Sequence, residues 1–98
     1  MPNPVKKTYN YYKKIAITTP NFADNKFVWD FVSAGILLLN EGTAGNVVEY
    51  SFDGVETHGE LDPSRASAGL SFDSRHHSKI YLRLASGTSA VIRIETWA

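Results

Sequence analysis

Two adjacent histidines, His76 and His77, are the side chains in this 98-residue chain that most readily suggest metal binding. Asp73 and His58 could add ligands, but neither stands at a spacing typical of a metal site. Neighbouring residues of a strand point to opposite faces of a sheet, so the two imidazoles can share one ion only within a bend. The sequence therefore predicts solvent-facing histidines, with no metal and no other cofactor.

The serines and carboxylates form no recognisable catalytic site either. A nucleophilic hydroxyl needs a base that a third group orients, and no Gly-x-Ser-x-Gly turn is present. Cleavage of a sugar needs paired carboxylates in a deep cleft, which a domain of this size rarely provides. The residues considered are Ser71, Ser74, Ser78, Glu41, Glu49, Asp53, Glu56 and Glu60. We therefore expect a protein that is not an enzyme and does not bind a small molecule.

Short apolar runs predict the elements that carry these side chains. In residues 27–31 and 80–84 every second residue is apolar, which matches the period of a β-strand and not that of a helix. Strands are predicted at residues 12–18, 26–32, 36–40, 47–52, 55–58, 70–72, 78–85 and 89–97. Ser33-Ala34-Gly35 is predicted to be a turn. Asp53-Gly54 is predicted to be a two-residue hairpin turn that pairs residues 55–58 with residues 47–52, and the last two strands are predicted to form a closing hairpin around Ser86-Gly87.

These elements predict an all-β fold. Strands at intervals of about ten residues are typical of a single antiparallel β-sandwich or jelly-roll-like domain, here of seven to eight short strands. We expect the sandwich to span residues 11–98, with residues 1–10 as an extended N-terminal arm. The composition, 43% hydrophobic and 12% aromatic, is that of a globular domain. No cysteine, signal peptide or membrane-length apolar run is present, so we expect a soluble protein with no membrane partner.

The charge is unevenly distributed along the chain. Residues 1–14 contain four lysines and no acid, whereas the remaining residues carry a net charge of −4, which makes the total zero. A basic start with several tyrosines suggests an arm that binds an acidic partner, and the alternative is a solvated, frayed leader. Nucleic acid is disfavoured as the partner because the body of the domain is acidic and the sequence pI is about 6.8.

A second candidate surface lies near the C-terminus. Tyr81 and Arg83 alternate with buried-type residues in one predicted strand, and Arg93 and Trp97 do so in the other. If the two strands pair, these side chains form one patch of the residue types that dominate binding hot spots. The alternative is that Trp97 only covers an edge of the core. The predicted partner-binding residues of the arm and this patch are Lys6, Lys7, Tyr9, Tyr11, Tyr12, Lys13, Tyr81, Arg83, Arg93 and Trp97.

From Leu38 onward the chain resembles small structural proteins of tailed bacteriophages. The resemblance is carried by residues 39–43, 50–54, 58–59, 61–63, 69–75, 78–83 and 91–97. It implies a non-enzymatic β-sandwich of the virion, assembled in the host cytoplasm. The member of that group we favour is a head decoration, or cement, protein that binds the major capsid protein and stabilises its lattice. Decoration proteins are commonly trimers, although no residue here dictates a threefold axis.

Two other functions stay open at this point. One is a tail or head–tail junction adaptor, which would share the sandwich and the arm. The other is a glycan-binding module, in which exposed aromatic side chains stack on sugars beside polar partners. The aromatic residues would be Trp97, Tyr81 or Tyr50, and the polar partners Asp53, Glu56 and Arg75.

Overall fold

The computed structural model describes residues 10–98, without the side chains of residues 73–75. Six strands form one antiparallel sheet, and two short 3-10 turns, η1 and η2, lie between strands. The strands are β1 (Asn10–Ile17), β2 (Lys26–Asn40), β3 (Val48–Ser51), β4 (Gly59–Leu61), β5 (Gly69–Leu84) and β6 (Ala90–Trp97), and the turns are η1 (Phe22–Asp24) and η2 (Ala66–Ala68). The predicted all-β class is confirmed.

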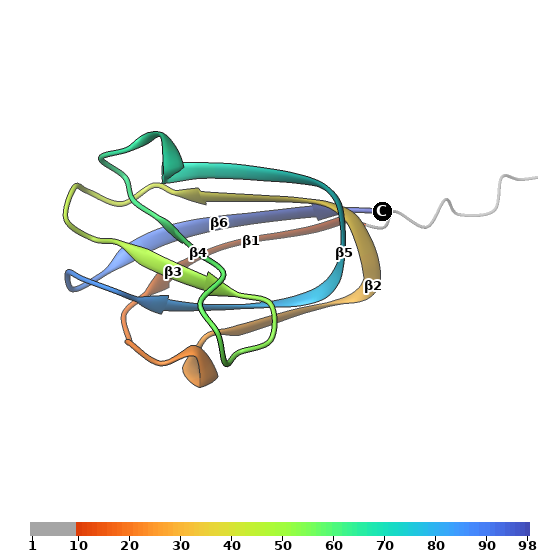
Figure 1. Ribbon diagram of the computed structural model, residues 1–98, viewed down its shortest axis with the longest axis horizontal. Helices are drawn as coiled ribbons and strands as arrows, with labels where there is room; N and C mark the ends of the chain where they lie inside the picture. The colour runs from red at the N-terminus through yellow and green to blue at the C-terminus, as the bar shows by residue number, and fades with distance from the viewer. Residues whose placement is uncertain (1–9) are drawn as a thin grey trace, which may run out of the picture.

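The sheet has the strand order β1-β6-β2-β5-β3-β4 and folds over on itself. Figure 1 shows why: β2 and β5 run together to one end of the molecule and both turn back there. The first layer contains β1, β6, residues 35–40 of β2 and residues 69–73 of β5. The second layer contains residues 26–28 of β2, residues 79–84 of β5, β3 and β4. The two layers make the predicted sandwich.

A local irregularity in β2 produces the bend. The β2–β5 register shifts on both sides of Ser33, and such irregularities bend a strand. The carbonyl of His77 in β5 accepts two hydrogen bonds there, one from the Trp29 indole and one from the Ser33 hydroxyl, both 2.9 Å long. Residues 33–35 are therefore part of a bent strand and not the predicted turn. β2 replaces the two strands predicted at residues 26–32 and 36–40, and β5 replaces those predicted at residues 70–72 and 78–85.

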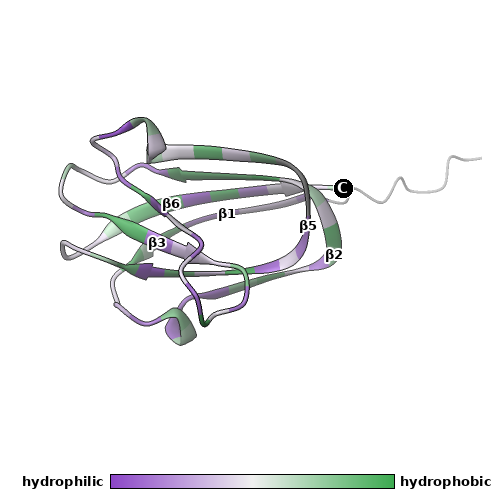
Figure 2. Cartoon of the chain, viewed as in Figure 1, coloured by the Kyte–Doolittle hydropathy of each residue, from purple (hydrophilic) through white to green (hydrophobic). Residues whose placement is uncertain are grey.

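The core lies between the layers and is almost entirely apolar. Alternate residues of each strand point inward, and Figure 2 shows hydrophobic and hydrophilic residues alternating along β6. The fully buried large side chains come from every strand: Ile17, Ile36, Leu38, Val48, Leu61, Ile80, Leu82, Ile92 and Ile94. Among the described residues the buried polar side chains are Ser33, Asn40, Ser51 and Thr96.

Two predicted pairings are wrong. β5 pairs with β2 and β3, and β6 pairs with β1 and β2, so the closing hairpin does not form. The partner of β3 is β4, at residues 59–61, and residues 55–58 belong to the loop between them. The predicted division into arm and domain stays a prediction, although Asn10 is the first residue of β1.

Candidate functional site

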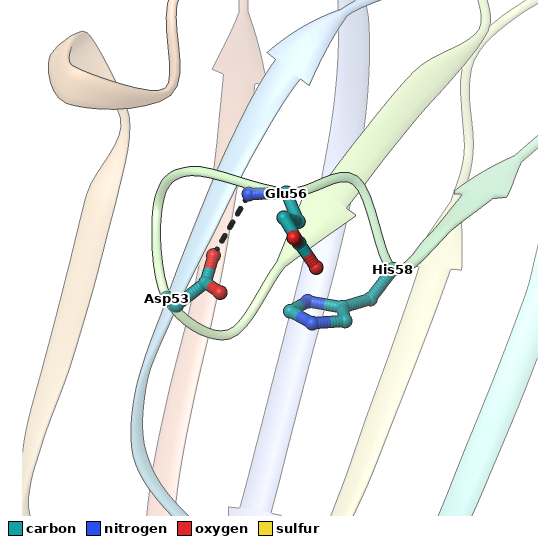
Figure 3. A group of neighbouring side chains, drawn as sticks. All are labelled: Asp53, Glu56 and His58. Carbon is teal, nitrogen blue, oxygen red and sulfur yellow. Dashed lines mark hydrogen bonds between the residues drawn. The ribbon is translucent and has the colours of Figure 1, made fainter.

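Three side chains of the β3–β4 loop lie close enough to hold a metal ion. One ligand atom each from Asp53, Glu56 and His58 lies within 4.8 Å of the other two, and all three residues are exposed. Figure 3 shows Glu56 and His58 on the same side of the loop, with Asp53 across it. The sequence drew attention to His58 and Asp53 only separately; the spacing Asp53-x-x-Glu56-x-His58 was the available signal.

The Asp53 carboxylate already has a structural role in this loop. Its Oδ1 accepts hydrogen bonds from the backbone N–H groups of Val55 and Glu56, at 2.8 and 2.9 Å, and from the Ser51 hydroxyl at 2.9 Å. These hydrogen bonds lower the pKa of Asp53 from 3.8 to about 2, and the two from the backbone have the largest effect. The carboxylate therefore organises the turn that Gly54 completes with a φ of 78°.

The hydrogen bond of His58 argues against a metal centre. Its Nδ1 accepts the backbone N–H of Phe52 at 3.0 Å, so the neutral ring carries its proton on Nε2. A histidine that ligates a metal instead donates its second N–H to an acceptor. A metal on Nδ1 would take the lone pair that accepts the Phe52 N–H, and a metal on Nε2 would move the ring proton to Nδ1. In both cases the hydrogen bond that closes the loop would be lost. The hydrogen bonds of Asp53 and His58 explain the cluster as a network that closes the loop.

The adjacent histidines do not share a role. His76 is exposed, as predicted. His77 is half-buried and its ring stacks on Phe52, with a centroid separation of 4.0 Å and an interplanar angle of 7°. The prediction that both histidines face solvent is therefore wrong for His77, because the bend of β5 directs this side chain against the aromatic residues of the β3–β4 loop.

The outer face of the first layer carries the most exposed aromatic side chains of the strands. Trp97 lies opposite Asn10 of β1 on one side and Gly35 of β2 on the other. Its indole covers Gly35, since a Cβ at that position would overlap the ring. Trp97 is 37% exposed, and Tyr12, on the same face of β1, is 61% exposed. Half-buried Leu37 and Leu39 of β2 continue this face.

Two ion pairs involve charged residues of the same face. Lys14 Nζ lies 3.5 Å from Glu41 Oε1, and Arg93 Nε lies 3.1 Å from Glu95 Oε2. Arg93 Nε has no hydrogen-bond partner among the described residues, so its contact with Glu95 is an ion pair without a hydrogen bond. We define this outer face by Tyr12, Lys14, Leu37, Leu39, Arg93, Glu95 and Trp97.

Tyr81 and Arg83 lie on the outer face of the second layer. The Arg83 guanidinium lies 4.2 Å from the centroid of the Phe22 ring and also donates to Glu49 at 2.8 Å and to Thr57 at 3.1 Å. The Tyr81 ring has the ammonium groups of Lys26 and Lys79 at 5.7 Å from its centroid. Arg83 is thus largely committed to contacts within the domain.

The structure therefore separates the predicted C-terminal patch. Tyr81 and Arg83 face away from the core on one side of the sandwich, and Arg93 and Trp97 do so on the other. The patch depended on the closing hairpin, which does not exist. The proposed glycan platform is divided in the same way, and Tyr50 is only 6% exposed, so it cannot stack on a sugar. A binding role for each residue taken singly stays a prediction.

The predicted arm residues have different environments. Lys6, Lys7 and Tyr9 lie outside the described residues. Tyr11 points inward, with its ring centroid 5.4 Å from that of Trp29, and burial raises its pKa. Tyr12 and Lys13 are exposed. The in-phase spacing of Tyr11 with Ile15 and Ile17 was the signal that this tyrosine belongs to the core.

The core between the layers is almost entirely apolar in the part of the chain that the structure describes. Its buried residues include no histidine and no carboxylate. A shallow depression of about 380 Å³ lies at the open end, between the loops that follow β1 and β5. It is lined by Thr18, Pro20, Leu84, Ala85, Ser86, Gly87 and Thr88, which include no acid, base or metal ligand.

Comparison with known proteins identifies the fold alone. No protein-family model and no curated protein sequence matches this chain. HppE in its Fe(II) form is 14% identical, with a TM-score of 0.56 over 91% of this chain and 43% of the HppE chain. Hydroxypropylphosphonic acid epoxidase from S. wedmorenis is 13% identical, with a TM-score of 0.52 over 92% of this chain and 44% of its own. This chain thus spans less than half the length of these enzymes.

A viral structure is also similar in fold. A chain in the acid-stable capsid of Helicobacter pylori bacteriophage KHP30 is 11% identical, with a TM-score of 0.51 over 93% of this chain and 89% of that chain. Viral capsid proteins, lectins and cupins all use double-sheet jelly rolls, so the architecture does not choose between them. Within the described residues, no helix is long and apolar enough to cross a membrane.

Proposed function

We propose that this chain is a non-enzymatic structural protein of a bacteriophage particle that decorates the head, binding the major capsid protein and stabilising its lattice. The observation that carries the proposal is the placement of Trp97. Its indole rests on the backbone of Gly35, on an outward sheet face, while the core behind it is buried and apolar. An exposed aromatic side chain held against a rigid sheet suits protein binding, because little conformational entropy is lost on contact.

Two further observations support this proposal over an enzymatic function. The likeness to the capsid chain covers 89% of that chain, so the fold of this domain corresponds to nearly the whole of one viral chain. The HppE likeness covers only 43% of that protein, and the buried residues among those described include no histidine, aspartate or glutamate. The resemblance of residues 38–98 to phage structural proteins supplies the assignment to a virion.

Copy number in purified particles tests the proposal. A head decoration protein occupies a repeated lattice position, so quantitative mass spectrometry should find it in hundreds of copies per particle, roughly the order of the capsid protein itself. About a dozen copies or fewer would contradict decoration and indicate a tail or junction adaptor, which occupies one symmetric ring. Absence from particles would contradict both positions.

The binding surface is tested with two substitutions of exposed apolar residues. Trp97→Ala should lower the affinity for empty capsids by at least about tenfold, as expected for an aromatic hot spot. Val55→Ala is the matched control, because Val55 is 79% exposed but lies in the β3–β4 loop, away from the outer face of the first layer. Equal loss with both variants, or none with Trp97→Ala, would contradict the role given to this face.

A further inference from the structure

The free edge of β1 is the longer of the two terminal edges of the sheet. β1 has eight residues and pairs on one side with β6, and within residues 10–98 no strand pairs with its other side. β4, the terminal strand at the other end of the order, has three residues. An edge strand presents a row of unpaired N–H and C=O groups, which another extended chain can continue.

Lys13 places a positive charge on the inward row of this edge strand. It lies in the inward row of β1, between Tyr11 and Ile15, and opposite fully buried Ile94 of β6. It is nevertheless exposed, and no ion pair joins it to any described residue, whereas its neighbour Lys14 pairs with Glu41. A strand added beside β1 would cover this ammonium group, and an unpaired charge that loses its water is costly.

We infer that the β1 edge binds an extended acidic segment of a partner protein, and that Lys13 selects the segment by pairing with a carboxylate on its inward face. The backbone groups of β1 would supply the hydrogen bonds common to any added strand. Lys13 supplies the discrimination, because a strand without an acid at that position leaves the charge unpaired. The inference deepens the proposed function by naming the chemistry of the capsid segment. Its assignment of that segment to the capsid protein rests on the proposed function.

A second copy of this chain is a poor occupant of the same edge. In an antiparallel pair of β1 strands, residues directly opposite each other share one face of the sheet. The register with full overlap places Lys13 opposite Lys14, and the two registers one residue away place Lys13 or Lys14 opposite itself. Like charges in directly opposed positions destabilise a strand pair. The charges of this edge are therefore complementary to an acidic strand and not to themselves.

Binding of two designed peptides to the full chain tests the inference. The probes are eight-residue strand peptides of alternating valine and threonine with a central glutamate, or with lysine at that position. By fluorescence anisotropy at low salt, the glutamate peptide should bind about tenfold more tightly than the lysine peptide. Hydrogen exchange should show the added protection in the amides of β1.

The variant Lys13→Glu should reverse the preference, and Lys13→Gln should reduce it to about equal binding. Lys26→Glu is the matched control: it makes the same charge change at an exposed position of β2, in the second layer, and should leave the preference intact. Equal binding of both peptides to the unaltered chain, an unchanged preference in Lys13→Glu, or protection outside β1 would each overturn the inference. Because these measurements use the isolated chain, a protein absent from phage particles that keeps the peptide preference would contradict only the proposed function.

Discussion

The indole of Trp97 occupies the space that a side chain at position 35 would fill. Gly35 and Trp97 are directly opposed in the β2–β6 ladder, and any Cβ at position 35 would overlap the ring. Gly35 is not among the glycines with positive φ, so backbone conformation does not require it. The glycine provides room, and the ring in turn covers the bare backbone of the strand just after the bend of β2.

Substitution of Gly35 by alanine should therefore destabilise the fold through Trp97. The added methyl group displaces the indole, and overpacking of this kind costs about 1–3 kcal/mol in the free energy of unfolding. Urea denaturation of the single variants and of Gly35→Ala/Trp97→Ala measures the coupling. In the double variant the methyl group meets no ring, so the cost of Gly35→Ala should largely disappear. An undiminished cost in the double variant would show that Trp97 is not the obstacle.

The Asp53 carboxylate should make stability depend on pH in a narrow acidic window. Because its pKa is lowered to about 2 in the folded chain, from 3.8, its contribution is present above pH 3.8 and is lost as the pH falls toward about 2. Asp53→Asn should flatten the dependence of the melting temperature on pH over this interval. Glu56→Gln, a change in the same loop, is the control. A slope equal to that of the unaltered protein in Asp53→Asn would contradict the assigned role.

Zinc should leave the stability unchanged despite the three clustered side chains. A ligand that binds the folded chain raises its melting temperature by mass action, and His58 can ligate only by giving up the Phe52 N–H. Melting with and without Zn²⁺ in about hundredfold excess over protein, for the unaltered chain and for His58→Ala, makes the comparison. A rise in melting temperature that His58→Ala abolishes would refute the loop-closing interpretation.

Asn40 should be more sensitive to a change of charge than to truncation. Its buried side-chain nitrogen donates to the carbonyls of Asn46 and Leu61, at 2.9 and 3.0 Å, and its oxygen accepts the N–H of Gly42 at 2.8 Å. Asn40→Ala should cost about 2–4 kcal/mol, because these buried groups lose their partners.

Asn40→Asp should cost more at neutral pH, since a carboxylate would face two carbonyl oxygens. Such a carboxyl has a raised pKa in the folded chain, so the penalty should shrink as the pH falls from that raised value toward the unfolded one. Chemical denaturation at pH 7 and pH 4 compares the two variants. A penalty for Asn40→Asp that does not depend on pH would contradict the burial of this side chain against those carbonyls.

Alternation within short segments was enough to predict most strands. In residues 80–84 and 92–94 the apolar positions recur every second residue, and these side chains are the buried ones in the structure. The two-residue period follows from the pleat of an extended backbone, which each segment carries wherever it pairs. For the same reason the inward phase of Tyr11 with Ile15 was present in the sequence, although the basic residues around it suggested an arm.

The bend and the pairing could not be obtained in this way. Ser33 and Gly35 have the composition of a turn, but both belong to a bent strand in which Ser33 donates to the carbonyl of His77, 44 residues away. The candidate surfaces follow from this bend. It sends Trp97 and Tyr81 to opposite sides of the sandwich, although they lie in the last two strands of the chain.

The sequence by itself determined the strand class and the apolar rows, because backbone geometry and side-chain alternation act over a few residues. Only the tertiary structure decided that β6 joins β1 and β2 and that His58 closes a loop. It also placed Lys13 on the inward row of the terminal strand β1, with no ion pair to any residue that the structure describes. Strand pairing depends on apolar area buried between segments far apart in the chain. No local pattern records which of several suitable partners buries the most.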